Sequence, residues 1–305
     1  MTTTPIGRLN IFLMLTVITF WGSSFVVVKI ALNEGLTPIT VATSRFLIAG
    51  ILFAAALIIK RSKARNYRLL VERKDIPVLL LLALTGVTFF FIIQYTGIQM
   101  AGASIASILV TLLSPIIIAV FSTRMLNEHL TRKQTVGIGI AAIGTLAVIL
   151  GGNPNLNGNA QFLYGSLILL ATPVLWAAYN LAGKKTLEKY DPFLVAGYVT
   201  VIGGLALIPF VFADNALSQI TSMSASSWVA ILFLAVACSL FGYFIWFYVL
   251  KQIGATVTSS FLFIEPLVTV LLAATLVGEQ LSIYTAAGGV LIFLGVHLIT
   301  RNKLI

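Results

Sequence analysis

Ten long apolar stretches divide the chain, and short polar segments separate them. Each holds about 20 mostly apolar residues, the length that an α-helix needs to cross a bilayer. Their apolar positions show little strand-like alternation, which argues against a membrane barrel. The pattern therefore predicts an all-α integral membrane protein with ten transmembrane helices. The stretches are 9–31, 38–60, 76–98, 103–125, 134–151, 162–183, 193–213, 227–250, 257–277 and 283–300.

The first stretch follows Arg8 and could be mistaken for a signal peptide. It lacks a convincing small-residue cleavage site, and nine further apolar stretches follow it. We therefore expect it to be a retained helix.

Composition excludes several classes of function. Hydrophobic residues make up 59% of the 305 residues and charged residues only 9%, and the mean hydropathy is +1.05. Soluble domains carry roughly 25% charged residues, so a soluble globule of this size would lack the polar residues to cover its surface. Soluble enzymes, nucleic-acid binders and disordered scaffolds are excluded. The single cysteine, Cys238, excludes an intrachain disulfide.

The basic residues predict how the helices cross the membrane, because cytoplasmic loops carry an excess of Lys and Arg. With the N-terminus inside, every basic residue except Lys29 and Arg45 falls in or beside a cytoplasmic segment. We therefore expect both termini on the cytoplasmic side of the cell membrane. The net charge of +10 then reflects topology, and the basic run 60–74 fits a solvated loop near anionic lipid better than a nucleic-acid site.

The second half of the chain repeats the first. Four matching pairs stand 151 positions apart: Pro115 and Pro266, Glu128 and Glu279, Gly137 and Gly288, Gly144 and Gly295. Two more stand 155 apart: Trp21 and Trp176, Lys29 and Lys184. Two repeats of five helices are therefore predicted, residues 1–151 and 152–305.

Because five is an odd number, the second repeat must enter the membrane upside down. This orientation places Glu128 at the cytoplasmic face and Glu279 at the outer face. Inverted repeats are an architecture of secondary transporters, since two equivalent halves can exchange conformations around a central site. Channels and intramembrane enzymes also contain repeats, so those alternatives stay open.

The repeated motifs resemble those of the EamA-type transporters in the drug/metabolite transporter superfamily. The first-helix run Trp21–Phe25 with Lys29 carries the resemblance, as does the stretch 126–131 after Pro115 and its echo 277–281 after Pro266. The resemblance implies ten helices in two inverted repeats around a central cavity. It also implies export of amino acids or other small metabolites, by a gradient or by facilitated diffusion. One departure is Asn127, where the family usually has glycine, which weakens the expectation of a tight turn in the first copy.

Glu265 is the deepest ionisable residue and a candidate for binding a proton or a cationic amine. Charged residues inside a bilayer are expensive, about +2.5 to +3.5 kcal/mol on insertion scales. The adjacent Pro266 removes a helical hydrogen bond and leaves polar backbone accessible. The alternative is a structural ion pair or a protonated acid that holds two helices together. Pro115 and Pro266 are also candidate kinks that let half-helices tilt.

The two basic residues inside spans have two interpretations each. Arg45 either faces the cavity, where it could pair with Glu265, or extends to the membrane interface. For Lys29 the sequence favours extension to the interface.

Small polar and aromatic side chains complete the predicted cavity. Ser104, Ser107, Thr111 and Ser114 share one helix face, and the deepest two, Thr111 and Ser114, are expected to line the cavity rather than pack helices. Aromatic faces attract ammonium groups, although aromatic residues also form interfacial belts and cores. The remaining candidates are Trp21, Ser24, Tyr95, Trp176, Tyr179, Trp246 and Phe263.

We expect an alternating-access exporter of small amphiphilic metabolites such as amino acids, with a proton as one candidate coupling ion. The alternatives are a passive channel, a drug or cation efflux carrier, and a membrane enzyme or lipid flippase partner. Two histidines and one cysteine give no metal constellation, and no hydrolase or nucleotide-binding motif occurs. No catalytic residue, metal, cofactor or nucleic acid is therefore expected, and the protein is a monomer or a homodimer. The glycines of spans five and ten predict close helix packing, within one chain or across a dimer.

Overall fold

A computed structural model describes residues 7–64, 66–151, 160–213, 216–277 and 283–301 of the chain. The described residues fold into helices joined by short turns. Six of these described helices are long and apolar enough to cross a membrane, counting segments that continue one another as one. They are α1 (Arg8–Asn33), α2 (Pro38–Lys63), α3 with α4 (Ile76–Ala83, Phe89–Ala101), α7 with α8 (Ala160–Leu169, Ala171–Lys189), α9 (Pro192–Ala213) and α11 with α12 (Ala225–Phe233, Gly242–Ile253).

The other helices complete the bundle. They are α5 (Ala103–Met125), α6 (Arg132–Gly151), the short α10 (Ala216–Thr221), α13 (Ala255–Ser260), α14 (Glu265–Val277) and α15 (Ile283–Arg301). The span predicted over 257–277 is thus divided: the 3-10 segment η4 (Phe261–Ile264) joins α13 to α14 directly before Glu265 and Pro266. By contrast, α5 passes through Pro115 as one α-helix. The two predicted proline kinks are therefore not equivalent in the structure.

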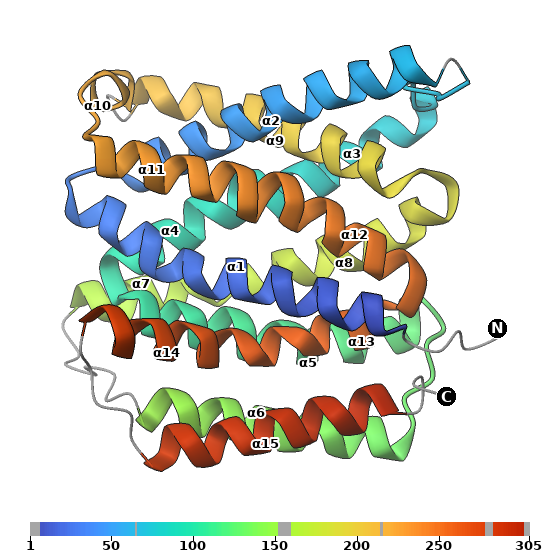
Figure 1. Cartoon of the computed structure of the whole chain (residues 1–305), viewed down its shortest axis with the longest axis vertical. Helices are drawn as coiled ribbons and strands as arrows, with labels where there is room; N and C mark the ends of the chain where they lie inside the picture. The colour runs from blue at the N-terminus through green and yellow to red at the C-terminus, as the bar shows by residue number, and fades with distance from the viewer. Residues whose placement is uncertain (1–6, 65, 152–159, 214–215, 278–282, 302–305) are drawn as a thin grey trace.

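Corresponding elements of the two halves run in opposite directions. In Figure 1, α1 begins on the side where α15 ends, whereas α7 begins on the opposite side. Helices α2 and α9 lie together at one end of the molecule, and α6 and α15 lie together at the other (Figure 1). Helices α1, α5, α12 and α14 occupy the middle, where the site described below is found.

Local backbone features also repeat. Gly102, before α5, has φ 89°, and Gly254, before α13, has φ 90°, a conformation that glycine adopts without strain. A π-helical segment interrupts the third span at Leu84–Thr88 (η2), and another interrupts the span of α11 and α12 at Leu234–Phe241 (η3). The same irregularities thus stand at matching places in both halves.

The turn after α5 brings Glu128 across to the second half. Asn127 has φ 52°, in the left-handed region that asparagine tolerates better than most residues. Asn127 therefore forms the tight turn for which the family usually has a glycine at this position, and the expectation of a weaker turn was wrong. The Glu128 carboxylate accepts hydrogen bonds from the backbone N–H groups of Ala255 (2.7 Å) and Thr256 (3.1 Å) at the start of α13. Its predicted counterpart, Glu279, lies outside the described residues.

Helices α6 and α15 pack backbone against backbone through the repeated glycines. A Cβ atom on Gly144 would lie 2.7 Å from the Gly288 carbonyl oxygen, and one on Gly295 would lie 2.6 Å from the Gly137 carbonyl oxygen. Small residues let helices approach this closely in a membrane, where packing rather than water drives association. The predicted smooth faces therefore meet within one chain.

We predict that Gly144→Ala destabilises the folded protein and Gly139→Ala does not. The added methyl at position 144 meets a carbonyl of α15, and overpacking of this kind costs about 1–3 kcal/mol. A Cβ atom on Gly139, on the same helix, meets no atom within 4 Å. Thermal unfolding of the purified protein in detergent measures the difference. Equal melting temperatures for the two variants would contradict close packing of α6 on α15.

Candidate functional site

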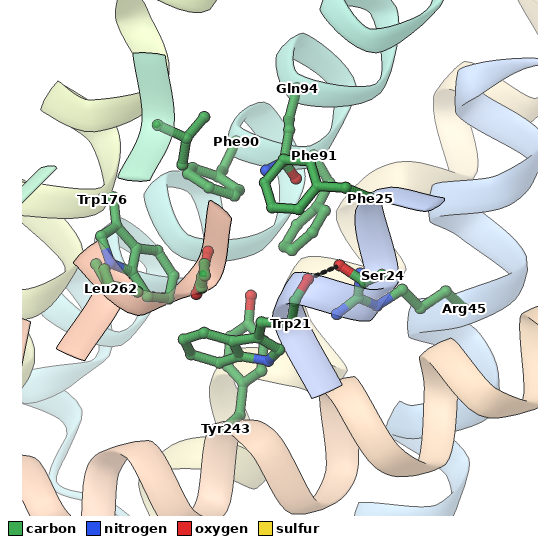
Figure 2. A pocket seen from close by; sticks show the side chains of 12 residues that line it. Trp21, Ser24, Phe25, Arg45, Phe90, Phe91, Gln94, Trp176, Tyr243 and Leu262 are labelled. Carbon is green, nitrogen blue, oxygen red and sulfur yellow. Dashed lines mark hydrogen bonds between the residues drawn. The ribbon is translucent and has the colours of Figure 1, made fainter. Parts of the chain in front are cut away.

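A small cavity lies in the middle of the bundle between helices of both halves. Its volume is about 40 Å³, room for only a few water molecules at ~10–15 Å³ each. Figure 2 shows Arg45 and Trp176 on opposite sides of it, with Trp21 and Tyr243 along one wall and Phe90 and Phe91 along another. The lining residues are Trp21, Ser24, Phe25, Arg45, Phe90, Phe91, Gln94, Val110, Trp176, Tyr243, Leu262 and Glu265.

Glu265 faces this cavity with an unused hydrogen-bonding atom. Only 3% of the residue is exposed, and its Oε1 atom is buried without a hydrogen-bond partner among the described residues. The Trp176 Nε1 atom, in the same lining, is also buried without a partner. Buried polar groups are normally paired, because an unmet one costs about 1–3 kcal/mol. The lining residues therefore include an acceptor and a donor with unused hydrogen-bonding capacity among the described residues.

Arg45 is fixed in place by uncharged partners. Its Nε donates to Ser239 Oγ (2.7 Å) and its Nη1 donates to the Tyr95 hydroxyl (2.5 Å). The guanidinium carbon lies 4.5 Å from the ring centre of Phe91, which is cation–π distance. The residue is 1% exposed, so it does not extend to the membrane interface. No ion pair within 4 Å joins Arg45 to Glu265 in the described part of the chain.

The aromatic wall is built around Trp21. Its ring centre lies 5.5 Å from that of Trp176, 5.0 Å from that of Trp246 and 6.0 Å from that of Tyr243. The pair Trp21 and Trp176 was matched by the sequence repeat, and the structure brings these two equivalent residues into contact. The cavity lining therefore has one tryptophan from each half.

The π-helical segments hold this wall in place. The carbonyl of Cys238 in η3 accepts a hydrogen bond from Trp21 Nε1 (2.9 Å). The carbonyl of Gly86 in η2 accepts one from the Tyr243 hydroxyl (2.7 Å). π-Bulges change the local backbone pairing and are frequent at functional sites. Each π-helical segment thus accepts a hydrogen bond from a side chain of the other half.

Five of the predicted cavity residues line the cavity: Trp21, Ser24, Arg45, Trp176 and Glu265. Three others support the lining from behind. Tyr95 binds Arg45, Tyr179 stacks on Trp176, and Trp246 contacts Trp21.

The structure does not bring the remaining three into the lining. Thr111 donates its hydroxyl to the Ser107 carbonyl (2.6 Å) on its own helix. Ser114 is buried with an unpartnered hydroxyl, and Phe263 is buried in η4. The hydroxyl stripe of α5 thus lies against protein at these depths.

One face of α4 supplies lining residues that were not among the predicted cavity residues. Gln94 lies three positions after Phe91 and four after Phe90, so it shares one side of the helix with both. That spacing was visible in the sequence, but it does not distinguish a cavity wall from an ordinary helix contact. Only the position of α4 opposite Trp21 and Glu265 decides between the two.

Comparisons with known proteins agree with this architecture. The model of the EamA-like transporter family matches residues 8–150 and 163–301. An uncharacterized transporter of Archaeoglobus fulgidus is 31% identical over 293 residues, which cover 96% of this chain and 99% of that protein. A probable amino-acid metabolite efflux pump of Salmonella typhimurium is 27% identical and matches 96% of this chain and 95% of its own length.

A solved crystal structure has the same fold, with a TM-score of 0.74 at 19% identity over 96% of this chain and 97% of that one. The family match over both halves confirms the resemblance that the first-helix run and the stretches after Pro115 and Pro266 indicated. The chain belongs to the EamA-like transporter family.

Proposed function

We propose that this protein is an alternating-access carrier that exports amino acids or similar small amphiphilic metabolites across the cytoplasmic membrane. In this proposal the chain crosses the bilayer ten times and keeps both termini inside. The four further crossings are α5, α6, α13 with α14, and α15. The distribution of basic residues and the opposite directions of the two halves in Figure 1 support this topology.

The observation that carries the proposal is that an acidic and a basic side chain line one aromatic cavity. A zwitterion needs an acid for its ammonium group, a base for its carboxylate and an apolar wall for its side chain. Glu265, Arg45 and the ring of Trp21 supply these three in one lining. Bidentate contact with a carboxylate is a common role of arginine. The name of the Salmonella typhimurium relative is consistent with this substrate class. A proton on Glu265 is the alternative to a bound ammonium group.

The small cavity implies that substrate enters through another conformation. A volume of about 40 Å³ leaves no room for an amino acid, so the described state is occluded. In this state the two halves are joined at both faces by polar contacts, which we name the outer clamp and the inner clamp.

The outer clamp joins Glu34, after α1, to the start of α11. The Glu34 carboxylate accepts hydrogen bonds from the hydroxyls of Ser224, Ser226 and Ser227, each at 2.5 Å. Hydrogen bonds from these three serines lower the pKa of the Glu34 carboxyl to about 2. The group therefore stays ionised, and the clamp stays intact, at every pH from neutral down to well below 4.5; it is lost only as the pH falls toward 2.

The inner clamp joins Lys189, at the end of α8, to the segment before α3. Lys189 Nζ lies 2.6 Å from Glu72 Oε1 and 2.5 Å from Asp75 Oδ2. Glu34 and Lys189 stand 155 positions apart, the same spacing as Trp21 and Trp176. In this proposal the two clamps occupy equivalent places at opposite faces: the outer one holds a carboxylate with serine hydroxyls, and the inner one holds an ammonium group with carboxylates. Opening one clamp at a time would give alternating access.

We predict saturable transport that depends on both cavity charges. Purified protein in liposomes should exchange labelled amino acids against unlabelled ones, a counterflow that a passive channel does not give. Arg45→Gln and Glu265→Gln should each weaken substrate binding about 10- to 100-fold, because a hydrogen bond to a charged group contributes about 1.5–3 kcal/mol. Lys29→Gln serves as control, since Lys29 is absent from the lining. The assay is run with and without a pH gradient to test the proton. Folded protein that moves no amino acid would contradict the proposal.

We predict that the clamp variants open opposite faces. The reporter is Ser24→Cys in a Cys238→Ser background, because Ser24 lines the cavity. Glu34→Gln should speed labelling by an impermeant thiol reagent from outside only, and Lys189→Met should speed it from inside only. Each variant is the control for the other. Faster labelling from the same side in both variants would refute the assignment of the clamps to opposite gates.

A further inference from the structure

A second hollow lies on the flank of the protein, away from the central cavity. It is lined by the end of α2, the start of α9 and the start of α12. Its volume is about 580 Å³, far larger than that of the occluded site. The lining residues are Ala56, Ile59, Lys60, Lys63, Ala64, Phe193 and Phe244. We name it the α2–α9 groove.

The groove is apolar at one end and basic at the other. Phe244 lies nine residues before the end of α12, which corresponds to roughly 14 Å along the helix axis. Phe193 packs against it, with ring centres 5.3 Å apart and nearly perpendicular. Lys60 and Lys63 belong to the last turn of α2, at the proposed cytoplasmic face. The groove therefore extends from the level of lipid headgroups into the hydrocarbon region.

The acid that pairs with Lys60 is already satisfied by protein groups. The Asp191 carboxylate accepts hydrogen bonds from the Tyr67 hydroxyl (2.8 Å) and the backbone N–H of Phe193 (3.1 Å), and it pairs with Lys60 Nζ at 3.3 Å. Lys63 is exposed and joins none of the ion pairs found among the described residues. Positive charge at the mouth of the groove thus exceeds the negative charge that could neutralise it.

We propose that the α2–α9 groove binds an anionic phospholipid of the cytoplasmic leaflet. One acyl chain lies against Phe193, Phe244 and Ile59, and the headgroup phosphate lies beside Lys63 with Lys60 behind it. The apolar depth of the groove requires a chain, which a soluble phosphate lacks. The excess positive charge favours an anionic headgroup over a zwitterionic one. The site also bridges the two halves, because α2 comes from the first and α9 and α12 from the second.

Lipid binding to the purified full-length protein tests this assignment without a transported substrate, so its result is independent of the proposed export activity. Native mass spectrometry with phosphatidylglycerol and phosphatidylcholine of identical chains gives the two affinities. We expect tighter binding of phosphatidylglycerol. Lys63→Gln should reduce that preference about fivefold, the contribution of one lysine near an anionic membrane surface. Lys133→Gln removes an exposed lysine at the start of α6 and should leave the preference unchanged.

A second variant tests the acyl chain. Ile59 is 53% exposed, so Ile59→Trp can fill the groove with little effect on the core. It should weaken the binding of phosphatidylglycerol while a thermal unfolding control confirms a folded protein. Equal effects of Lys63→Gln and Lys133→Gln would overturn the proposal in favour of nonspecific charge attraction. Full competition by glycerol 3-phosphate would overturn it in favour of a soluble phosphate ligand, and unchanged binding to Ile59→Trp would exclude the groove.

Discussion

The absence of water from the hydrocarbon core of a bilayer is the constraint on which this structure depends. Every backbone group there must pair within the protein, which explains why the described residues form helices joined by short turns. The same constraint makes a buried charge informative. Arg45 satisfies it with Ser239, Tyr95 and aromatic rings, whereas Glu265 keeps a carboxyl oxygen that has no partner in the part of the chain that the structure describes. The two charges in the central cavity are thus held in different ways, and the less satisfied one is the stronger indication of a ligand.

Departures from regular helix provide the polar atoms that pure helices would hide. The segments η2 and η3 offer carbonyls to Tyr243 and Trp21, and η4 ends directly before Glu265. Because η2 and η3 stand at matching places in inverted halves, the side chains they hold meet in the same central cavity. Close glycine packing of α6 on α15 lies apart from this region. The bundle is therefore closely packed where α6 meets α15 and irregular at its centre. An irregular centre suits a binding site whose access changes.

Particular residues show which features of the site could be predicted from the sequence and which could not. Trp21 and Trp176 were paired by repeat spacing, and Glu265 was singled out by its depth in a span; all three line the cavity. Thr111 and Ser114 were expected there on equally good helical spacing, yet they face protein. Arg45 allowed two orientations until its partners were known. Asn127 departed from the family glycine but adopts the same left-handed turn. Periodicity predicts on which face of its own helix a side chain lies. What packs against that face depends on helices that are distant in sequence.

The sequence by itself determined the helical membrane class, the repeat and the family resemblance, because apolar length, basic loops and spaced motifs are properties of the chain in order. Only the tertiary structure decided that Arg45 and Glu265 share a cavity without an ion pair between them among the described residues, and that Glu34 contacts serines at the start of α11 while Lys189 contacts Glu72 and Asp75. It also placed the lysines at the end of α2 beside phenylalanines of α9 and α12. These are contacts between segments up to about 200 residues apart, and they arise from how helices pack rather than from any local pattern.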